Sequence, residues 1–579
     1  MTPTEALHTY FGLKAFRPLQ QEIIQSVLDG RDTLALLPTG GGKSLCFQIP
    51  VLVQEGLCLV ITPLVALMKD QVANLHRRGI HAAAIYSGMS YDQQQTALDN
   101  CQYGPYRCLY ISPERLESNN FRLRLRRLPV TLIAVDEAHC ISQWGYDFRP
   151  SYLKIGELLQ TFAGENTPRQ VPVLALTATA TPEVVEDIQD KLCFRNRNVL
   201  RTSFARANLH YVVRRCAEDR PNAADTGTLR TKTEEIQHIL SRVRGSAIVY
   251  VRNRKRAEEL AKVLHSSFYH AGLTTQERTR RQEAWTHDTG VIVCTNAFGM
   301  GIDKPDVRVV IHYDLPDSPE AYFQEAGRAG RDGQPAFAVL LYSSSDRTKA
   351  RKRVRDNYPT RAFINEVYHK TSDFLTVGAE SGAGHSFVLH TDELCRVMHL
   401  PVLPTYSALH ILSAAGYINF QEQQETQTRV LIHISRNEMA GYALSPQQHE
   451  LLLSLMRQYP GIFTDLQYIH EEITDDIHRL LVSLASRHIV TYLPASCEDR
   501  ITYLLDRQRD ITLSSHVLEE REAIYVKRLK AMVEYAEQTV ACRQQFLLHY
   551  FGESDAPACG RCDVCRSVGK TDNTVSSVN

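Results

Sequence analysis

The sequence lacks a net charge of either sign, because 65 lysine and arginine residues balance 65 aspartate and glutamate residues. A surface for a polyanionic partner would therefore have to be a local patch. The sequence also has no uncharged apolar run long enough to cross a bilayer. Its first residues lack the basic and apolar regions of a secretion signal. We therefore expect a soluble protein in the cytoplasm.

Most of the chain also lacks the paired cysteines of a disulfide framework. Apart from four near the C-terminus, the 14 cysteines are scattered singly through predicted strands and helices, as Cys58, Cys108 and Cys294 are. This distribution is typical of reduced thiols inside a cell. With 579 residues the chain is long enough for several buried cores, and we expect about three to five domains.

A glycine-rich turn follows a predicted strand in residues 34–44. Its three glycines let the backbone N–H groups turn inward, and a helix that begins near Lys43 adds the positive end of its dipole. Lys43 would reach the β- and γ-phosphates of a nucleotide, and the Ser44 hydroxyl would hold Mg²⁺. Leu37 stands where the usual pattern has a further glycine, and a flexible loop is the alternative. The candidate nucleotide contacts are Thr39, Gly40, Gly41, Gly42, Lys43 and Ser44.

A glutamine precedes this turn, at the start of the helical pattern in residues 21–28. The side chain of Gln20 offers both a donor and an acceptor, which an adenine edge requires. Arg17 lies in the same segment and is a further candidate contact with the nucleotide. A solvated helix start is the alternative for Gln20.

Apolar strand-like runs alternate with helical patterns through the first third of the chain, which predicts a parallel sheet covered on both faces. Functional loops are expected at the carboxyl ends of its strands. At one such end, Asp136 is placed to hold Mg²⁺ through water, and Glu137 to polarise the attacking water. A helix cap is the alternative for this pair. Residues 177–180 end another strand, and we interpret their hydroxyl groups as a link that responds to bound phosphate.

Between these two strand ends lies a predicted loop, residues 140–150, that is rich in aromatic residues. Trp144 and Phe148 could stack on nucleic-acid bases, and Arg149 adds a positive charge. The alternative is that both aromatic rings fill a local core.

The alternation of strands and helices then repeats after a polar stretch at residues 201–231, which predicts a second α/β domain without a phosphate-binding turn of its own. Two blocks stand out, residues 297–303 with Asp303 and residues 324–333 with Arg328 and Arg331. We expect the two arginines to share one face of a helix, where planar guanidinium groups suit phosphate oxygens. A solvated basic helix end is the alternative.

These motifs together, from Phe11 to about Tyr342, resemble the RecQ family of superfamily 2 DNA helicases, and the loop around Trp144 is close to family-specific. The resemblance implies two tandem RecA-like motor domains and an ATP-driven 3′→5′ DNA-unwinding activity in repair, recombination or replication. It also implies that Gln20 reads adenine, that Arg331 is the arginine finger, and that the Trp144 loop couples DNA to hydrolysis. The expected partner is a junction of single-stranded and duplex DNA, and the expected state is a monomer, nucleoid-associated in a bacterium.

The last third of the chain departs from the usual RecQ order. Two short helices and a hairpin formed by residues 417–421 and 428–435 predict a winged-helix-like domain, which could bind DNA or protein. We therefore divide the chain into a first motor domain (1–203), a second motor domain (204–345), a basic helical linker (346–386), a winged-helix-like domain (387–440), a helix-rich region (441–510), a helical zinc-binding module (511–566) and a disordered tail (567–579).

Four cysteines near the C-terminus have the spacing of a zinc site: Cys542, Cys559, Cys562 and Cys565. The segment that follows the first of them, residues 543–553, resembles the RecQ zinc module. A helical run at residues 519–537 precedes it. We expect the zinc module to dock on the second motor domain, with residues 387–505 inserted as an excursion.

The leading interpretation is an ATP-dependent DNA helicase that uses ATP, Mg²⁺ and Zn²⁺. One alternative is a clamp or remodeller that grips nucleic acid without separating its strands, and another is an RNA helicase.

Overall fold

The computed structural model describes the chain except residues 39, 87–88, 90, 143–144, 146–147, 163–169, 218–228, 300–303, 426–427, 460–461, 464–466, 470–472, 495–496 and 568–579. Predictions for Thr39, Trp144, Asp303 and nearly all of the tail therefore lie outside the described residues. Among the helices of the described part, none is both long and apolar enough to cross a membrane. The chain forms two compact units, Met1–Arg351 with Ala523–Asn579, and Lys352–Glu522.

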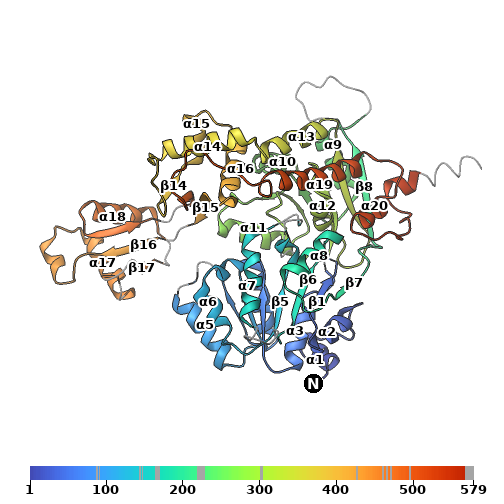
Figure 1. The fold of residues 1–579 in the computed structure, drawn as a ribbon, viewed down its shortest axis with the longest axis horizontal. Coiled ribbons are helices and arrows are strands. Elements are labelled where there is room, and N and C mark those ends of the chain that lie inside the picture. The colour runs from blue at the N-terminus through green and yellow to red at the C-terminus, as the bar shows by residue number, and fades with distance from the viewer. Residues whose placement is uncertain are drawn as a thin grey trace, which may run out of the picture. The chain divides into compact units, whose positions relative to one another are not determined.

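The first domain is built on a seven-stranded sheet in the order β3-β4-β2-β5-β6-β1-β7, in which every registered pair is parallel (Figure 1). Its strands are β1 (Thr33–Leu36), β2 (Leu57–Ile61), β3 (Ala82–Ile85), β4 (Cys108–Ile111), β5 (Val130–Val135), β6 (Val173–Thr177) and β7 (Val199–Arg201). β1, β2, β4 and β6 are buried at every position, as in a sheet covered on both faces. The predicted parallel sheet is confirmed.

The helices of the first domain surround this sheet and begin where the sequence offers caps. At the first of them, Thr2 and Glu5 form a capping box that satisfies backbone N–H groups at the helix start. The helices are α1 (Pro3–Phe11), α2 (Gln20–Leu28), α3 (Leu45–Val53), α4 (Val65–Arg77), α5 (Tyr91–Tyr103), η1 (Pro113–Glu117), α6 (Asn119–Leu125), η2 (Ala138–Ile141), η3 (Pro150–Leu153), α7 (Lys154–Thr161) and α8 (Pro182–Lys191).

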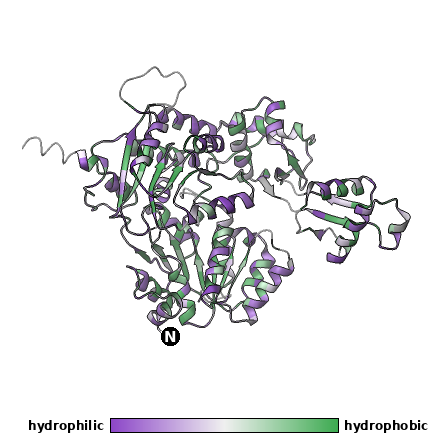
Figure 2. Ribbon diagram, turned by 180° about the vertical axis from the view of Figure 1, so that it is seen from behind, coloured by the Kyte–Doolittle hydropathy of each residue, from purple (hydrophilic) through white to green (hydrophobic). Residues whose placement is uncertain are grey.

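The second domain has a six-stranded parallel sheet in the order β10-β11-β9-β12-β13-β8. Its strands are β8 (Leu209–Arg215), β9 (Ser246–Tyr250), β10 (Ser267–Tyr269), β11 (Val291–Cys294), β12 (Val307–His312) and β13 (Ala336–Tyr342), and its helices are α9 (Lys232–Arg242), α10 (Arg254–Val263), α11 (Thr275–His287) and α12 (Pro319–Ala326). Figure 2 shows apolar residues concentrated in the strands of both large sheets.

One strand of this sheet, β8, lies inside the polar stretch at residues 201–231, where the sequence analysis did not expect a strand. Leu209, Tyr211 and Val213 alternate with more exposed residues, and all three are buried against the sheet. This period of two is the pattern of a strand with one buried face. The charged residues that follow the strand obscure it in the sequence.

The C-terminal module consists of α19 (Glu519–Glu537), α20 (Arg543–Tyr550) and the loop that carries the last three cysteines. Residues from Ala523 onward belong to the same compact unit as the two large sheets. The hydroxyl of Tyr535 donates to that of Tyr322 on α12 (3.3 Å), and Phe551 packs edge-to-face on Phe323 with ring centroids 5.1 Å apart. The predicted docking of the module on the second motor domain is confirmed.

The second unit begins within α13 (Asp346–Asn357) and contains a small three-stranded sheet in the order β14-β19-β15. Its elements are α14 (Arg361–Phe374), β14 (Ser386–Leu389), α15 (Thr391–Val397), α16 (Val402–Ala414), β15 (Ile418–Glu425) and β19 (Cys497–Tyr503). This order of helices and strands is that of a winged helix. α14 is part of the same core through Ile364, Val367 and Tyr368, so we do not assign it to the predicted linker.

The predicted hairpin in this unit is wrong. β15 pairs with β19, about seventy residues later, and not with the next strand, β16 (Arg429–Ile432). The sheet forms this way because β19 carries the buried side chains Ile501 and Tyr503 and can pair with β14 on its other edge. The β16 strand instead joins β17 (Gln467–Tyr468) and β18 (Val490–Leu493), with η4 (Glu438–Gly441), α17 (Pro446–Gln458) and α18 (Asp475–Ser486), around a separate core. A small α/β subdomain is thus inserted between β15 and β19, across the boundary predicted at residue 440.

Candidate active site

The glycine-rich turn predicted at the end of β1 is formed, and we call it the phosphate-binding turn after its predicted role. Gly40 and Gly42 both have φ of +79°, a conformation that glycine adopts without strain, and α3 begins directly after Ser44. Gln20, which is buried, donates through Nε2 to the carbonyl oxygens of Gly41 (3.2 Å) and Gly42 (3.0 Å). Arg17 donates to the carbonyl of Gly40. Both side chains therefore hold the shape of the turn, and a contact between Gln20 and adenine stays a prediction.

The two carboxylates follow the end of β5, which is separated from β1 by one strand of the sheet. Glu137, in the left-handed region with φ of +47°, follows Asp136 directly after β5, and its Oε1 lies 3.4 Å from Lys43 Nζ. Burial and the adjacent Glu137 charge raise the pKa of Asp136 above its ordinary value. Burial also raises the pKa of Glu137, but Lys43, His139 and Arg328 outweigh it, so its pKa lies below its ordinary value. Glu137 is thus held ionised beside the phosphate-binding turn.

The order of the strands explains why these groups meet. β6 lies between β1 and β5, so three neighbouring strands end at one edge of the sheet. Thr177, the last residue of β6, is 2.9 Å through Oγ1 from Nδ1 of His139. His139 Nδ1 is also 3.4 Å from Glu137 Oε2. The hydroxyl-rich segment predicted to respond to phosphate is therefore connected to the carboxylate pair through one buried histidine.

The two arginines of the second domain do not share a helix face, and that prediction is wrong. α12 ends at Ala326, and both arginines follow it in a turn in which Gly330 has φ of +62°. Arg328 is buried and donates to the carbonyl of Gly299. The side chain of Arg331 crosses to the first domain, and its Cγ lies 3.7 Å from the position that a Cβ on Gly40 would take. The structure therefore brings Arg331 to the phosphate-binding turn.

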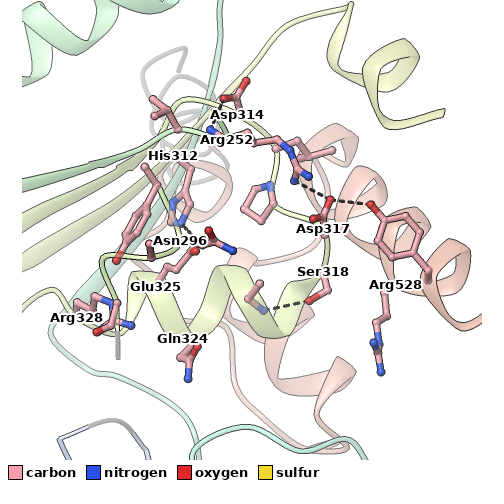
Figure 3. A pocket seen from close by; sticks show the side chains of 18 of the residues that line it. Arg252, Asn296, His312, Asp314, Asp317, Ser318, Gln324, Glu325, Arg328 and Arg528 are labelled. Carbon is pink, nitrogen blue, oxygen red and sulfur yellow. Dashed lines mark hydrogen bonds and ion pairs between the residues drawn. The ribbon is translucent and has the colours of Figure 1, made fainter. Parts of the chain in front are cut away.

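Of the residues predicted to contact DNA in the loop after η2, the structure describes Phe148 and Arg149, and the side chain of Phe148 is half-buried. Arg149 lines a cavity of about 460 Å³. The cavity lies at the carboxyl ends of β9 and β12, near Arg252 and His312 (Figure 3). Arg252 and Arg528, which the sequence analysis did not single out, also line it. In the cavity wall, Arg252 pairs with Asp317 (2.7 Å between NH1 and Oδ1), and His312 Nε2 lies 2.9 Å from Glu325 Oε2. A sequence signal existed for Arg252, because it closely follows an apolar strand.

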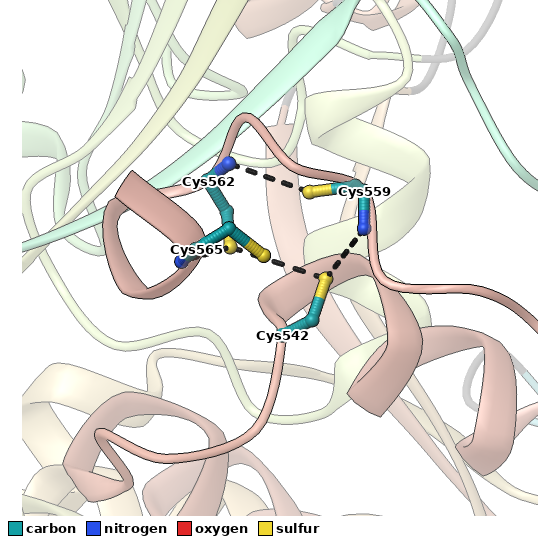
Figure 4. Close-up of side chains that lie close together, drawn as sticks. All are labelled: Cys542, Cys559, Cys562 and Cys565. Atoms are coloured by element: carbon teal, nitrogen blue, oxygen red, sulfur yellow. Dashed lines mark hydrogen bonds between the residues drawn. The ribbon is translucent and has the colours of Figure 1, made fainter. Parts of the chain in front are cut away.

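The four predicted cysteine ligands converge in the C-terminal module (Figure 4). Their Sγ atoms all lie within 4.8 Å of one another. Sulfur atoms at the corners of a tetrahedron around zinc would be about 3.8 Å apart, from Zn–S bonds of about 2.3 Å. Backbone N–H groups donate to Sγ of Cys542 (3.2 Å, from Cys559) and of Cys559 (3.3 Å, from Cys562). The hydrogen bonds from Cys559 and Cys562 lower the pKa of Cys542, which favours a thiolate. The donor set fits a tetrahedral metal ion.

Comparison with known families matches three parts of the chain. Residues 17–188 match the DEAD/DEAH box helicase family, and residues 231–333 match the helicase conserved C-terminal domain. Residues 499–566, which contain the four clustered cysteines, match the RecQ zinc-binding family. Fold, site and matches together define a two-domain helicase motor.

Relatives narrow this class further. The probable ATP-dependent DNA helicase RecS of Bacillus subtilis (strain 168) is 43% identical over 350 residues, which cover 59% of this chain and 67% of that protein. The ATP-dependent DNA helicase RecQ of Pasteurella multocida (strain Pm70) is 41% identical over 60% of this chain and 53% of its own length. The chain belongs to the RecQ family of ATP-dependent DNA helicases.

The matches leave part of each protein uncovered, since this chain spans about half to two thirds of the length of these relatives. Among solved structures, the crystal structure of the DUF1998 helicase MrfA bound to DNA has a TM-score of 0.50 at 20% identity, covering 61% of this chain and 50% of that one. That likeness supports the two-domain fold alone.

Proposed function

We propose that this chain is an ATP-dependent helicase that couples ATP hydrolysis to 3′→5′ separation of duplex DNA. The observation that carries the proposal is the position of Arg331. This residue of the second domain lies against Gly40 of the first, so one nucleotide bound at the turn would touch both domains. A motor of this kind converts hydrolysis into relative movement of its two domains.

The residues around the turn have separate roles in this proposal. Lys43 binds the β- and γ-phosphates, and Ser44 together with Asp136 holds Mg²⁺, which offsets phosphate charge when bound. Glu137, kept ionised by its cationic neighbours, orients the attacking water and accepts its proton. Arg331 meets the charge that develops on the transferred phosphoryl group. Arg17, Gln20 and Gly40 to Gly42 shape the nucleotide pocket.

We further propose that the four clustered cysteines hold one structural Zn²⁺. All four ligand positions are filled by thiols, and the backbone amides donate to sulfur, as in closed structural sites. Cys562 is fully buried, which fits a role in folding and not in chemistry at the surface. Metal analysis of the purified chain should find one zinc per molecule.

The DNA strand is proposed to bind at the cavity lined by Arg149, Arg252 and Arg528. Several guanidinium groups around one cavity suit the phosphates of a nucleic-acid backbone. The winged-helix-like unit offers less support for DNA binding through its helices. α16 occupies the position of a recognition helix, yet residues 402–414 contain no lysine or arginine.

The experiment that tests the proposal is strand displacement on DNA and RNA duplexes that carry either 3′ or 5′ overhangs. We expect unwinding of DNA with a 3′ overhang only, and only with hydrolysable ATP. The Arg331→Ala variant should lose hydrolysis by on the order of 10³-fold while ATP affinity changes little. Displacement of RNA would identify an RNA helicase. ATP-dependent retention of duplex without displacement would identify a clamp.

A further inference from the structure

We propose that the segment joining the two motor domains, residues 202–208, is a positioning element for the arginine finger. We call this segment the linker, and we call residues 327–334, which carry Arg328 and Arg331, the arginine loop. Arg206 and Asn208 of the linker are the positioning residues. The inference rests on the proposed function, because it concerns how Arg331 is held for ATP hydrolysis.

The linker holds the arginine loop through the carbonyl groups of its backbone. Arg206 NH2 donates to the carbonyl oxygens of Ala329 (3.0 Å) and Gly330 (2.9 Å), and its NH1 donates to that of Gly327 (3.3 Å). Asn208 Nδ2 donates to the carbonyls of Gly330 (2.7 Å) and Gln334 (2.9 Å). Two linker side chains therefore satisfy the carbonyl groups of four residues in an eight-residue turn.

The guanidinium of Arg206 is partly buried and donates its hydrogen bonds to the arginine loop. Burial lowers the pKa of Arg206, and among the described residues no carboxylate pairs with it. A partly desolvated cation bonded to carbonyl groups is costly to leave unpaired. The opposite side of the loop is fixed independently, since Gly330 N donates to the carbonyl of Val307 (2.9 Å) and Asp332 N to that of Pro305 (3.2 Å). The backbone that carries Arg331 is thus hydrogen-bonded to the linker on one side and to residues 305–307 on the other.

The same linker starts at the phosphate-binding turn. β7 pairs with β1, the strand that ends in the turn, and Thr202 N donates to the carbonyl of Leu36 (3.4 Å). Arg206, four residues after Thr202, donates hydrogen bonds to the arginine loop. The linker is therefore a short covalent connection between the two halves of the nucleotide site, and a shift of β1 relative to the second domain changes the position of Arg331.

The zinc-binding module holds the linker in turn. Glu553 accepts from Ser203 Oγ (2.7 Å, at Oε2) and from Phe204 N (2.7 Å, at Oε1). The ring of Phe204 packs between Phe551 of the module and Phe323 of α12, with centroids 5.5 Å and 6.2 Å away. This arrangement gives the module a role in hydrolysis, through the linker and without any contact with the nucleotide.

A positioning role and a merely structural role predict different kinetics. If Arg206 acts through Arg331, Arg206→Ala should lower kcat for DNA-stimulated ATP hydrolysis by on the order of tenfold, with KM for ATP changed by less than about twofold. Arg206→Lys should recover part of kcat, because an ammonium can still donate to these carbonyls. Asn208→Asp should be slower than Asn208→Ala, since a carboxylate would repel two carbonyl oxygens.

The decisive variant is the double replacement Arg206→Ala with Arg331→Ala. It should hydrolyse ATP no more slowly than Arg331→Ala alone, because the first change acts only through the residue that the second removes. Arg201→Ala, an exposed arginine beside the linker, is the matched control and should keep wild-type kcat. Glu553→Ala should lower kcat while the zinc content stays at one per chain.

The outcomes separate the inference from the proposed function. Multiplicative losses in the double variant, or a wild-type kcat in Arg206→Ala, would overturn the positioning role and leave the proposed function standing. An unchanged kcat in folded Arg331→Ala would overturn both, because Arg331 would then not be the finger. Circular dichroism and the thermal midpoint of each variant identify misfolding. If Arg206→Ala does not fold, Arg206→Lys, Asn208→Ala and Asn208→Asp, each alone and combined with Arg331→Ala, provide the same test.

Discussion

The buried ion pair between Arg543 and Asp563 gives the strongest test of how the C-terminal module is stabilised. Arg543 is 2% exposed, and its Nε and NH2 groups lie 3.0 Å and 3.1 Å from the two carboxylate oxygens of Asp563. It also donates to the carbonyl of Tyr535 on α19. Asp563 accepts in addition from the backbone N of Val213 on β8 (3.2 Å). Arg543 and Asp563 each directly follow a cysteine of the cluster. Replacing Arg543 with Met should therefore destabilise the cysteine cluster.

The size of the effect follows from the burial of the pair. Removing one partner of a buried ion pair costs about 3–5 kcal/mol, because the other charge is left without compensation. The Asp563 side chain is 21% exposed and keeps the Val213 amide, so the lower end applies. A cost of about 3 kcal/mol corresponds to ~100-fold in the population of the opened module. If zinc leaves through that opened state, Arg543→Met should lose zinc to a chelator ~100-fold faster.

The assay is zinc release to a coloured chelator, followed with ATPase activity as a check that the motor is folded. Arg566→Met, which removes an exposed arginine of the same module, is the control and should release zinc at the wild-type rate. The double variant Arg543→Met with Asp563→Asn should recover part of the loss, because no buried charge stays unpaired. Release from Arg543→Met at the wild-type rate would refute the reasoning.

Three further predictions concern the motor. Lys43→Ala should abolish ATP turnover and leave DNA binding measured by fluorescence anisotropy nearly unchanged; near-normal turnover would contradict the assigned phosphate contact. Glu137→Gln should bind ATP with Mg²⁺ in equilibrium titration but lose hydrolysis, since the carboxylate activates water and does not hold the nucleotide; lost affinity would make it structural. Trp144→Ala should keep ATPase activity but displace fewer base pairs per ATP consumed, and normal coupling would return the ring to a local core.

The parts of the site that the sequence predicted are those in which neighbouring residues determine the chemistry. Three glycines before Lys43 permit the phosphate-binding turn whatever the rest of the chain does, and the turn is formed. A carboxylate pair directly after an apolar run must lie at a strand end, as Asp136 and Glu137 do. The cysteine spacing likewise predicts a cluster without knowledge of the fold around it.

The parts that the sequence did not predict depend on residues far apart in the chain. Arg206 and Asn208 lie in a polar stretch, and only the fold shows that their partners are carbonyl groups more than a hundred residues away. No side-chain pattern reveals a partner that is a backbone carbonyl. The prediction that Arg328 and Arg331 share a helix face is different, because Gly327 and Gly330 are helix-ending signals that are visible in the sequence and that this prediction overlooked.

The misassigned hairpin follows from a preference for neighbours in the sequence. Two alternating runs a few residues apart are usually paired, but here they belong to different sheets. The register explains why this is possible without disturbing the small sheet. Gln424 pairs with Glu498 and Glu425 with Cys497, so the inserted subdomain leaves and re-enters between adjacent strands, as a hairpin loop would.

An insertion with adjacent ends adds little closure entropy to the sheet, because the cost grows only logarithmically with loop length and the subdomain has a core of its own. The same reasoning applies to the second unit as a whole. It is inserted between Arg351 and Ala523, so 171 residues separate the two parts of the first unit in sequence, and the C-terminal module still rejoins the motor. Contact with α12 and with the linker, and not sequence order, therefore makes this module part of the motor.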